Sequence, residues 1–173
     1  RRSINDLIMQ QRSIAGYRSD LGPTNGITRY RVSASYQAEM HITPVAPWCL
    51  SPTLIRLRAE IASPITVAIA SNYDPRTCAF RAIHAHEMQH VQITRQTMQR
   101  VAHILRENLA NHLENRFYSV PAPETAQRSF SADMQQFISW AVAFAEQELR
   151  QANSVIDTPE PYRQLHSQCQ DWS

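Results

Sequence analysis

The sequence contains no lysine, so all 17 of its basic side chains are arginines. This absence excludes Schiff-base chemistry, a P-loop lysine and Ser–Lys catalysis. Glycine is also scarce, with 3 residues in 173, which argues against glycine-rich phosphate loops. No apolar run approaches the roughly 18 residues that a membrane span requires. The sequence also lacks an excess of either charge: its net charge is +2, and it contains no run of basic residues. We therefore expect no nucleic-acid partner.

Hydrophobic residues make up 43% of the chain, which is enough for a core, and the length predicts one domain over residues 1–173. The three cysteines, Cys49, Cys78 and Cys169, lack the C-x-x-C spacing of a zinc knuckle. They are either thiols of a cytosolic protein or one disulfide and one thiol of an exported protein. The first residues show no apolar signal region, so we expect a chain that is cytosolic or already processed.

The first part of the chain has the pattern of strands, because apolar and polar residues alternate or β-branched residues accumulate. The segments with this pattern are 30–37, 55–61 and 65–70. Neighbouring prolines predict a loop at Trp48 and Cys49. Residues 28–75 are therefore expected to form a small antiparallel sheet, preceded by a short helix over 4–15.

The pattern then becomes helical. Thr77 is a suitable N-cap, and the region 77–118 contains no glycine or proline, so it is long enough for two helices or one bent helix. A second helix is predicted over 131–153, and the prolines at 159 and 161 predict a loop after it. This order of elements predicts an α+β fold.

The strongest functional signal is the motif H-E-x-x-H at residues 86–90. In a helix His86 and His90 lie about 40° apart on one face, so both imidazoles can bind one cation. Zinc lowers the pKa of its bound water to about 7, and Glu87 is placed to accept the proton of that water. The motif predicts Zn²⁺ held by His86 and His90, with Glu87 as general base and then general acid. The alternative is two surface histidines on an amphipathic helix.

A catalytic zinc ion needs a third protein ligand. The residues after His90 lack the glycine and histidine that the metzincin pattern requires, which favours an acidic ligand from a later helix. Glu148 lies near the centre of the apolar stripe of the second helix, where an unpaired carboxylate is costly, and is therefore the predicted ligand. Pairing of Glu148 with an arginine remains an alternative. Four rival ligands remain open: His112, Glu114, Asp157 and His166.

An oxyanion stabiliser is also expected, and the lack of lysine restricts a cationic one to arginine, histidine or the zinc itself. Tyr162 and His166 are the candidates by position, because a C-terminal segment can cover a cleft. Packing of Tyr162 against the helices is the alternative. His84 faces away from His86 and is expected at the surface or behind the site.

The residues from Cys78 to Val91, C-A-F-R-A-I-H-A-H-E-M-Q-H-V, resemble the core of a bacterial family of secreted zinc-dependent proteases, the domain of unknown function 922. Trp48-Cys49-Leu50 and the segment from Asn153 to Thr158 are similar to further parts of that family. The resemblance implies a metallopeptidase site, export to the periplasm or medium, and a disulfide. For the disulfide it favours Cys49–Cys78, with Cys78–Cys169 as the alternative.

Together these observations predict an exported zinc metallopeptidase that acts on a peptide or protein substrate. Its expected fold is zincin-like, with a small antiparallel sheet followed by the H-E-x-x-H helix and a second long helix. An edge strand over 65–70 would align an extended peptide beside the motif. Two alternatives remain open: a metal-binding module that binds a partner without hydrolysis, and a hydrolase of peptidoglycan peptides.

Overall fold

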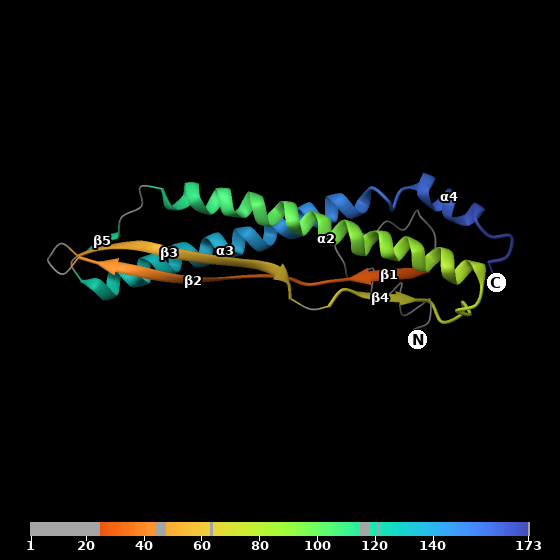
Figure 1. Ribbon diagram of the computed structural model, residues 1–173, viewed down its shortest axis with the longest axis horizontal. Helices are drawn as coiled ribbons and strands as arrows, with labels where there is room; N and C mark the ends of the chain where they lie inside the picture. Colours follow the sequence, from red (N-terminus) through yellow and green to blue (C-terminus); the bar gives the residue numbers. More distant parts are fainter. Residues whose placement is uncertain (1–24, 44–47, 63, 115–117, 121, 173) are drawn as a thin grey trace. The chain divides into compact units, whose positions relative to one another are not determined.

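The computed structural model describes residues 25–43, 48–62, 64–114, 118–120 and 122–172. In these residues the protein is α+β, with two small antiparallel sheets and three helices, which confirms the predicted fold class (Figure 1). The chain divides into two compact units. One comprises residues 1–31, 62–97 and 147–173, and the other comprises 32–61 and 98–146. The helix predicted over 4–15 lies outside the described residues.

The first unit contains a two-stranded sheet and the first part of a long helix. Strand β1 (Gly26–Arg29) pairs antiparallel with β4 (Thr66–Ile69), and both run beside the start of α2 (Cys78–Leu113) (Figure 1). Strand β4 confirms the strand predicted over 65–70. A buried cluster joins the sheet, the turn after β4 and the helix, and its members are Ile27, Ala70, Tyr73, Ala79 and Ile83.

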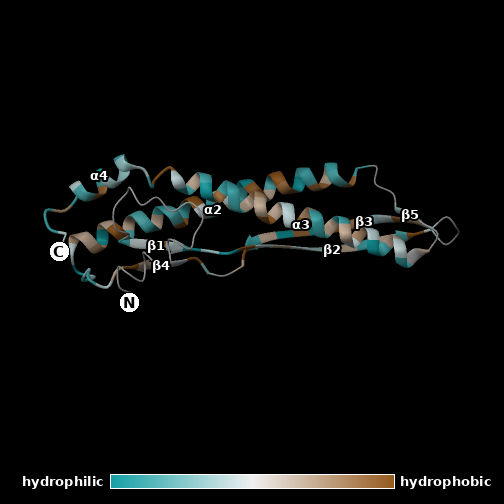
Figure 2. Ribbon diagram, turned by 180° about the vertical axis from the view of Figure 1, so that it is seen from behind, coloured by the Kyte–Doolittle hydropathy of each residue, from teal (hydrophilic) through white to brown (hydrophobic). Residues whose placement is uncertain are grey.

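Helix α2 is one continuous helix of 36 residues, which decides between the two arrangements that its sequence allowed. Thr77 caps it as predicted: the backbone N–H of Phe80 donates to the Thr77 hydroxyl oxygen at 3.2 Å. Hydrophilic and hydrophobic residues interleave along α2 and α3 (Pro123–Ser154), as expected for helices that bury one side (Figure 2).

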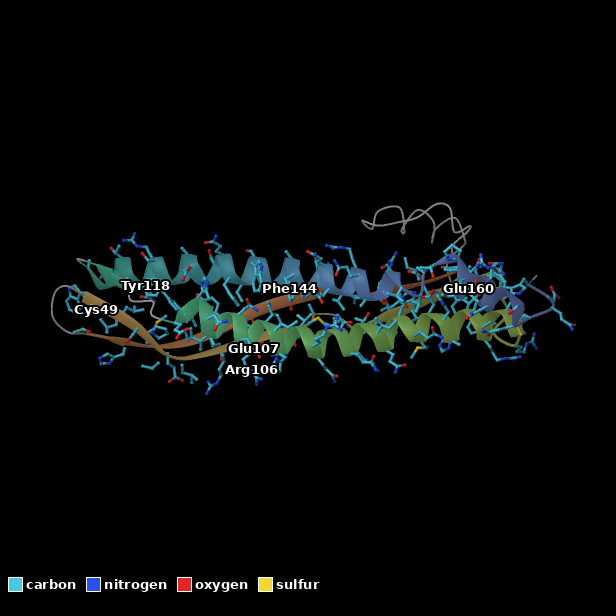
Figure 3. The ribbon with its side chains drawn as sticks, turned by 90° about the horizontal axis from the view of Figure 1, so that it is seen from above. Cys49, Arg106, Glu107, Tyr118, Phe144 and Glu160 are labelled. Carbon is cyan, nitrogen blue, oxygen red and sulfur yellow. A yellow bond between two sulfur atoms is a disulfide. The ribbon has the colours of Figure 1, made fainter. Side chains whose placement is uncertain are left out.

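The second unit contains a three-stranded antiparallel sheet in the order β2-β3-β5. The strands are β2 (Val32–Ile42), β3 (Trp48–Ile61) and β5 (Tyr118–Val120). The ring of Phe130, from α3, lies 6.0 Å from the ring of Tyr36 and 5.6 Å from that of Tyr118. Figure 3 labels Tyr118 and Cys49 where β5 pairs with β3.

Prolines account for the differences between the expected and observed elements. Trp48 and Cys49 begin β3 instead of forming a loop, because Pro52 lies opposite Met40 at a register shift, where a strand tolerates proline. Helix α3 begins at Pro123, before the predicted start at 131, since a proline fits the first helical turn. The segment predicted as a loop contains α4 (Pro159–Ser167), which also begins with proline. Tyr118, the last residue of the region predicted as helical, instead begins β5.

A disulfide joins Cys78 to Cys169, with 5.8 Å between their Cα atoms. The favoured pairing of Cys49 with Cys78 is therefore wrong, and the alternative pairing is confirmed. Cys49 lies on β3 in the second unit, whereas Cys78 starts α2 in the first. Among the described residues, no helix has the length and apolar character needed to cross a membrane.

Candidate metal centre

Three side chains of the first unit converge in a group that could hold a metal ion. His86 and His90 project from α2, and Asp157 lies in the turn between α3 and α4. Oδ1 of Asp157 lies 3.1 Å from Nε2 of His90 and 3.4 Å from Nε2 of His86. The two imidazole rings are 4.9 Å apart and nearly perpendicular, so their Nε2 atoms approach the same carboxylate oxygen from different directions.

The distances of Asp157 to the two histidines are compatible with ligands of one metal ion. Two ligands of a tetrahedral zinc ion, each about 2.0–2.2 Å from the metal, lie roughly 3.3–3.5 Å from one another. The two contacts of Asp157 are close to that separation. In addition, Nε2 of His86 is buried and makes no hydrogen bond within the described chain, although a buried ring nitrogen ordinarily has a partner. A metal ion would satisfy it.

The ring of His90 is held from behind by α3. Its Nδ1 lies 2.9 Å from Oδ1 of Asn153, a residue in the last turn of that helix. The amide nitrogen of Asn153 donates to the carbonyl of Leu149 at 2.8 Å and to the hydroxyl of Thr94 at 3.3 Å. Groups behind a metal-binding histidine commonly orient its ring in this way.

Glu87 lies beside the group and against strand β1. The Thr28 hydroxyl donates to Oε2 of Glu87 at 2.7 Å. A Cβ atom on Gly26 would lie 2.6 Å from Oε1 of Glu87, so the close approach of the strand requires glycine there. Burial raises the pKa of Glu87, and the Thr28 hydroxyl and the nearby histidines counteract this rise in part.

The charges of the group are coupled. Burial alone would lower the pKa of His90, but its hydrogen bond to Asp157 and the charges of Asp157 and Glu87 outweigh burial and raise it. Burial likewise opposes ionisation of Asp157, yet its close contacts with His86 and His90 and the charges of these histidines outweigh burial and lower the pKa of Asp157 to about 2. Asp157 is therefore an anion at neutral pH, which is the form that binds a cation.

Of the two candidates for an oxyanion stabiliser, Tyr162 lies at the group. Its ring is 5.4 Å from that of His86. Burial, followed by the charges of Asp157 and Glu87, raises the pKa of Tyr162, so the phenol keeps its proton at neutral pH. His166 instead packs against Trp172, with 4.3 Å between the centres of the two tilted rings.

The other candidate ligands lie elsewhere. Glu148 is half-buried on α3 and is not a member of the group, whose third member and acidic residue is Asp157. His112 approaches Asp133 at 3.2 Å in the second unit. Glu114 is exposed after the end of α2. His84 is exposed as expected and stacks on Phe80.

Sequence reasoning missed the supporting residues Gly26, Thr28 and Thr94, and it gave Asn153 no role. Gly26 and Thr28 lie on β1, a strand that the sequence pattern did not predict, so no local signal marked them. Thr94 and His90 are four apart on α2, and Asn153 and Asp157 are four apart in the other segment. The first pair shares one side of its helix, which is the signal that could have identified Thr94. Asp157 lies in the turn after α3, where helical spacing does not apply.

Protein-family models, curated proteins and solved structures were all compared with the chain, and none of them matched it. The resemblance to the family of secreted zinc-dependent proteases therefore stays a prediction.

Proposed function

We propose that the protein is a zinc-dependent peptidase of zincin-like build, with His86, His90 and Asp157 as the zinc ligands. The observation that carries the proposal is the position of Glu87. It follows the first ligand directly, is 5% exposed, and has a raised pKa beside three groups whose donor atoms lie within 4.8 Å of one another. A buried carboxylate with a raised pKa next to a metal site is suited to general acid–base catalysis.

The residues of the chain then have distinct roles. Bound zinc would supply a Lewis acid that polarises a peptide carbonyl and makes water more acidic. Glu87 takes a proton from the attacking water and delivers it to the leaving amine. Tyr162, which stays protonated, donates a hydrogen bond to the oxygen on which negative charge develops.

Strand β1 is the better candidate for aligning a peptide substrate. The sequence favoured the strand over 65–70, but it is β1 whose Thr28 contacts Glu87. We propose that an extended substrate pairs along β1. Export is part of the same proposal, and it is compatible with the disulfide between Cys78 and Cys169, because such bonds persist in oxidising compartments.

Glu87→Gln tests the proposal. The variant should bind one zinc ion like the native protein and lose on the order of 10²–10⁴-fold in hydrolysis, because the amide cannot accept the proton. Zinc content is measured by elemental analysis, and hydrolysis with casein and a quenched fluorescent peptide library. Glu107→Gln, at an exposed position of the same helix, is the matched control (Figure 3). Cleavage by Glu87→Gln at the native rate would contradict the role of Glu87.

A second candidate function is a metal-binding module that recognises a partner without hydrolysis. It is favoured by the contacts of Glu87, whose carboxylate already accepts a hydrogen bond from Thr28 and packs against Gly26. A native protein that binds zinc and leaves casein, the peptide library and peptidoglycan peptides uncleaved would support this candidate. Cleavage of the peptidoglycan peptides alone would identify a cell-wall hydrolase.

A further inference from the structure

The side-chain amide of Asn153 has one orientation that its surroundings allow. The carbonyl oxygen of Leu149 has no hydrogen to donate, so the group that faces it at 2.8 Å must be the NH₂ group of Asn153. The same NH₂ group faces the buried hydroxyl of Thr94. The amide oxygen is therefore turned toward His90, and its distance to Nδ1 is 2.9 Å.

The orientation of this amide determines the tautomer of His90. An amide oxygen accepts hydrogen bonds and donates none, so the proton at this contact belongs to Nδ1 of His90. In a neutral imidazole the other nitrogen then carries the lone pair. That nitrogen is Nε2, which faces Asp157 at 3.1 Å, within the group that could hold a metal ion.

We propose that Asn153 is a positioning residue of the metal centre, which locks His90 as the Nδ1–H tautomer and presents Nε2 to the metal. This inference rests on the proposed zinc site but not on peptidase activity. Asn153 also precedes Asp157 by four residues, so the end of α3 both orients one ligand and leads to another. An imidazole without such a partner exchanges its proton between both nitrogens and rotates, which weakens its binding of metal.

The native protein provides the first test. In zinc-loaded protein labelled with ¹⁵N-histidine, long-range ¹H–¹⁵N spectra distinguish a protonated from a metal-bound ring nitrogen. We expect His90 to carry its proton on Nδ1 and to bind zinc through Nε2. Zinc on Nδ1, with the proton on Nε2, would overturn the inference.

Variants provide the second test, with zinc affinity measured by competition with a chromophoric chelator. Asn153→Leu has nearly the same size but no acceptor, and we expect it to bind zinc about 10–100-fold more weakly. The matched control is Asn108→Leu on α2, because Asn108 makes the same bond to the carbonyl four residues before it and has no histidine partner among the described contacts. Its zinc affinity should equal that of the native protein.

Asn153→Asp distinguishes a lost acceptor from a disturbed helix end. Like Asn153→Leu, it loses the N–H bond to the carbonyl of Leu149, but it keeps an oxygen for the Nδ1–H group of His90. If the acceptor alone matters, zinc affinity should stay within about threefold of native. The visible spectrum of the Co²⁺-loaded protein should likewise change in Asn153→Leu and not in Asn153→Asp. If Asn153→Leu bound zinc as tightly as the native protein, the role of Asn153 would be contradicted, but the metal centre would not. A native protein that binds no zinc would contradict the metal centre itself.

Discussion

At the scale of single residues, Glu87 has two neighbours on β1 that act on the same carboxylate. Thr28 donates a hydrogen bond to Oε2, and Gly26 lets the strand approach Oε1 closely. Because Glu87 is almost fully buried, this hydrogen bond replaces part of the hydration that the anion has lost. The two residues of the strand therefore influence both the orientation and the protonation of the base that the proposed reaction needs.

Thr28→Val should show how much this hydrogen bond contributes. Valine matches threonine in shape but leaves the buried Glu87 carboxylate without its donor, so we expect the free energy of unfolding at pH 7 to fall by about 1.5–3 kcal/mol. Urea denaturation followed by circular dichroism measures it. Thr28→Ser keeps the hydroxyl and should lose far less. Equal losses in both variants would assign the effect to the methyl group and contradict the prediction.

The sequence predicts the part of the site that lies within one helical turn. His86, Glu87 and His90 are found because their spacing alone places them together on α2. Thr28 and Asp157 meet them from segments 59 and 67 residues away along the chain. Such contacts depend on how the elements pack against one another, and the spacing of residues within a motif gives no information about that packing.

At the scale of elements, α3 explains why Glu148 was favoured over Asp157. The prediction placed Glu148 near the centre of the apolar stripe, assuming that one straight stripe runs along the helix. In the structure the buried positions Ala141, Ala145 and Leu149 follow one another at intervals of four residues. Each such interval turns about 40° beyond a full turn, so the buried side rotates along the helix. By residue 148 it has moved toward Leu149, and Glu148 remains at its edge.

The disulfide connects two elements that contribute to the metal centre. Cys78 is the first residue of α2, and Cys169 follows α4, which carries Tyr162. The indole of Trp172 packs nearby against the buried cluster of the first unit. The disulfide therefore holds the C-terminal segment beside the helix that bears His86 and His90.

Replacing both cysteines, Cys78→Ser with Cys169→Ser, should lower the free energy of unfolding. The bond closes a loop with a sequence separation of 91 residues, and the chain entropy that it removes from the unfolded state corresponds to about 4.6 kcal/mol. We expect a loss of about 2–4 kcal/mol in guanidinium denaturation. Cys49→Ser is the control, because Cys49 is outside this disulfide. Unchanged stability of the double variant would show that packing alone holds the segment.

At the scale of the whole molecule, the α+β class was predictable because it follows from the order of strand and helix patterns. The assembly of the first unit was not, since it combines three segments from distant parts of the chain. Each segment contributes to the candidate site: β1 provides Thr28, α2 provides the histidines, and the region after α3 provides Asp157. Folding of this unit and formation of the site are therefore expected to be coupled.

The protonation states of His90 and Asp157 should stabilise the folded first unit when no metal is bound. The pKa of His90 is raised above 6.5 in the folded state, so its contribution to stability is fully present below about pH 6.5 and is lost as the pH rises through the folded pKa. The pKa of Asp157 is lowered from 3.8 to about 2, so its contribution is present above about pH 4 and is lost as the pH falls toward 2. The ion pair of the two residues is complete between these limits.

We therefore expect rising pH to destabilise the metal-free protein and to increase the stabilisation that zinc provides. With a chelator, the melting temperature should fall as the pH rises from about 6.5 to 8, because His90 loses the proton that pairs it with Asp157. With zinc at about 100 times its dissociation constant, the melting temperature at pH 8 should be about 5–10 °C higher than with the chelator, and this gain should grow with pH because zinc no longer competes with that proton. Differential scanning calorimetry measures both series. His90→Gln should weaken both trends, whereas His103→Gln, at an exposed position of α2, should keep them. A melting temperature that rises with pH in the chelator, over the same range, would contradict the proposed exchange of a proton for the metal at His90.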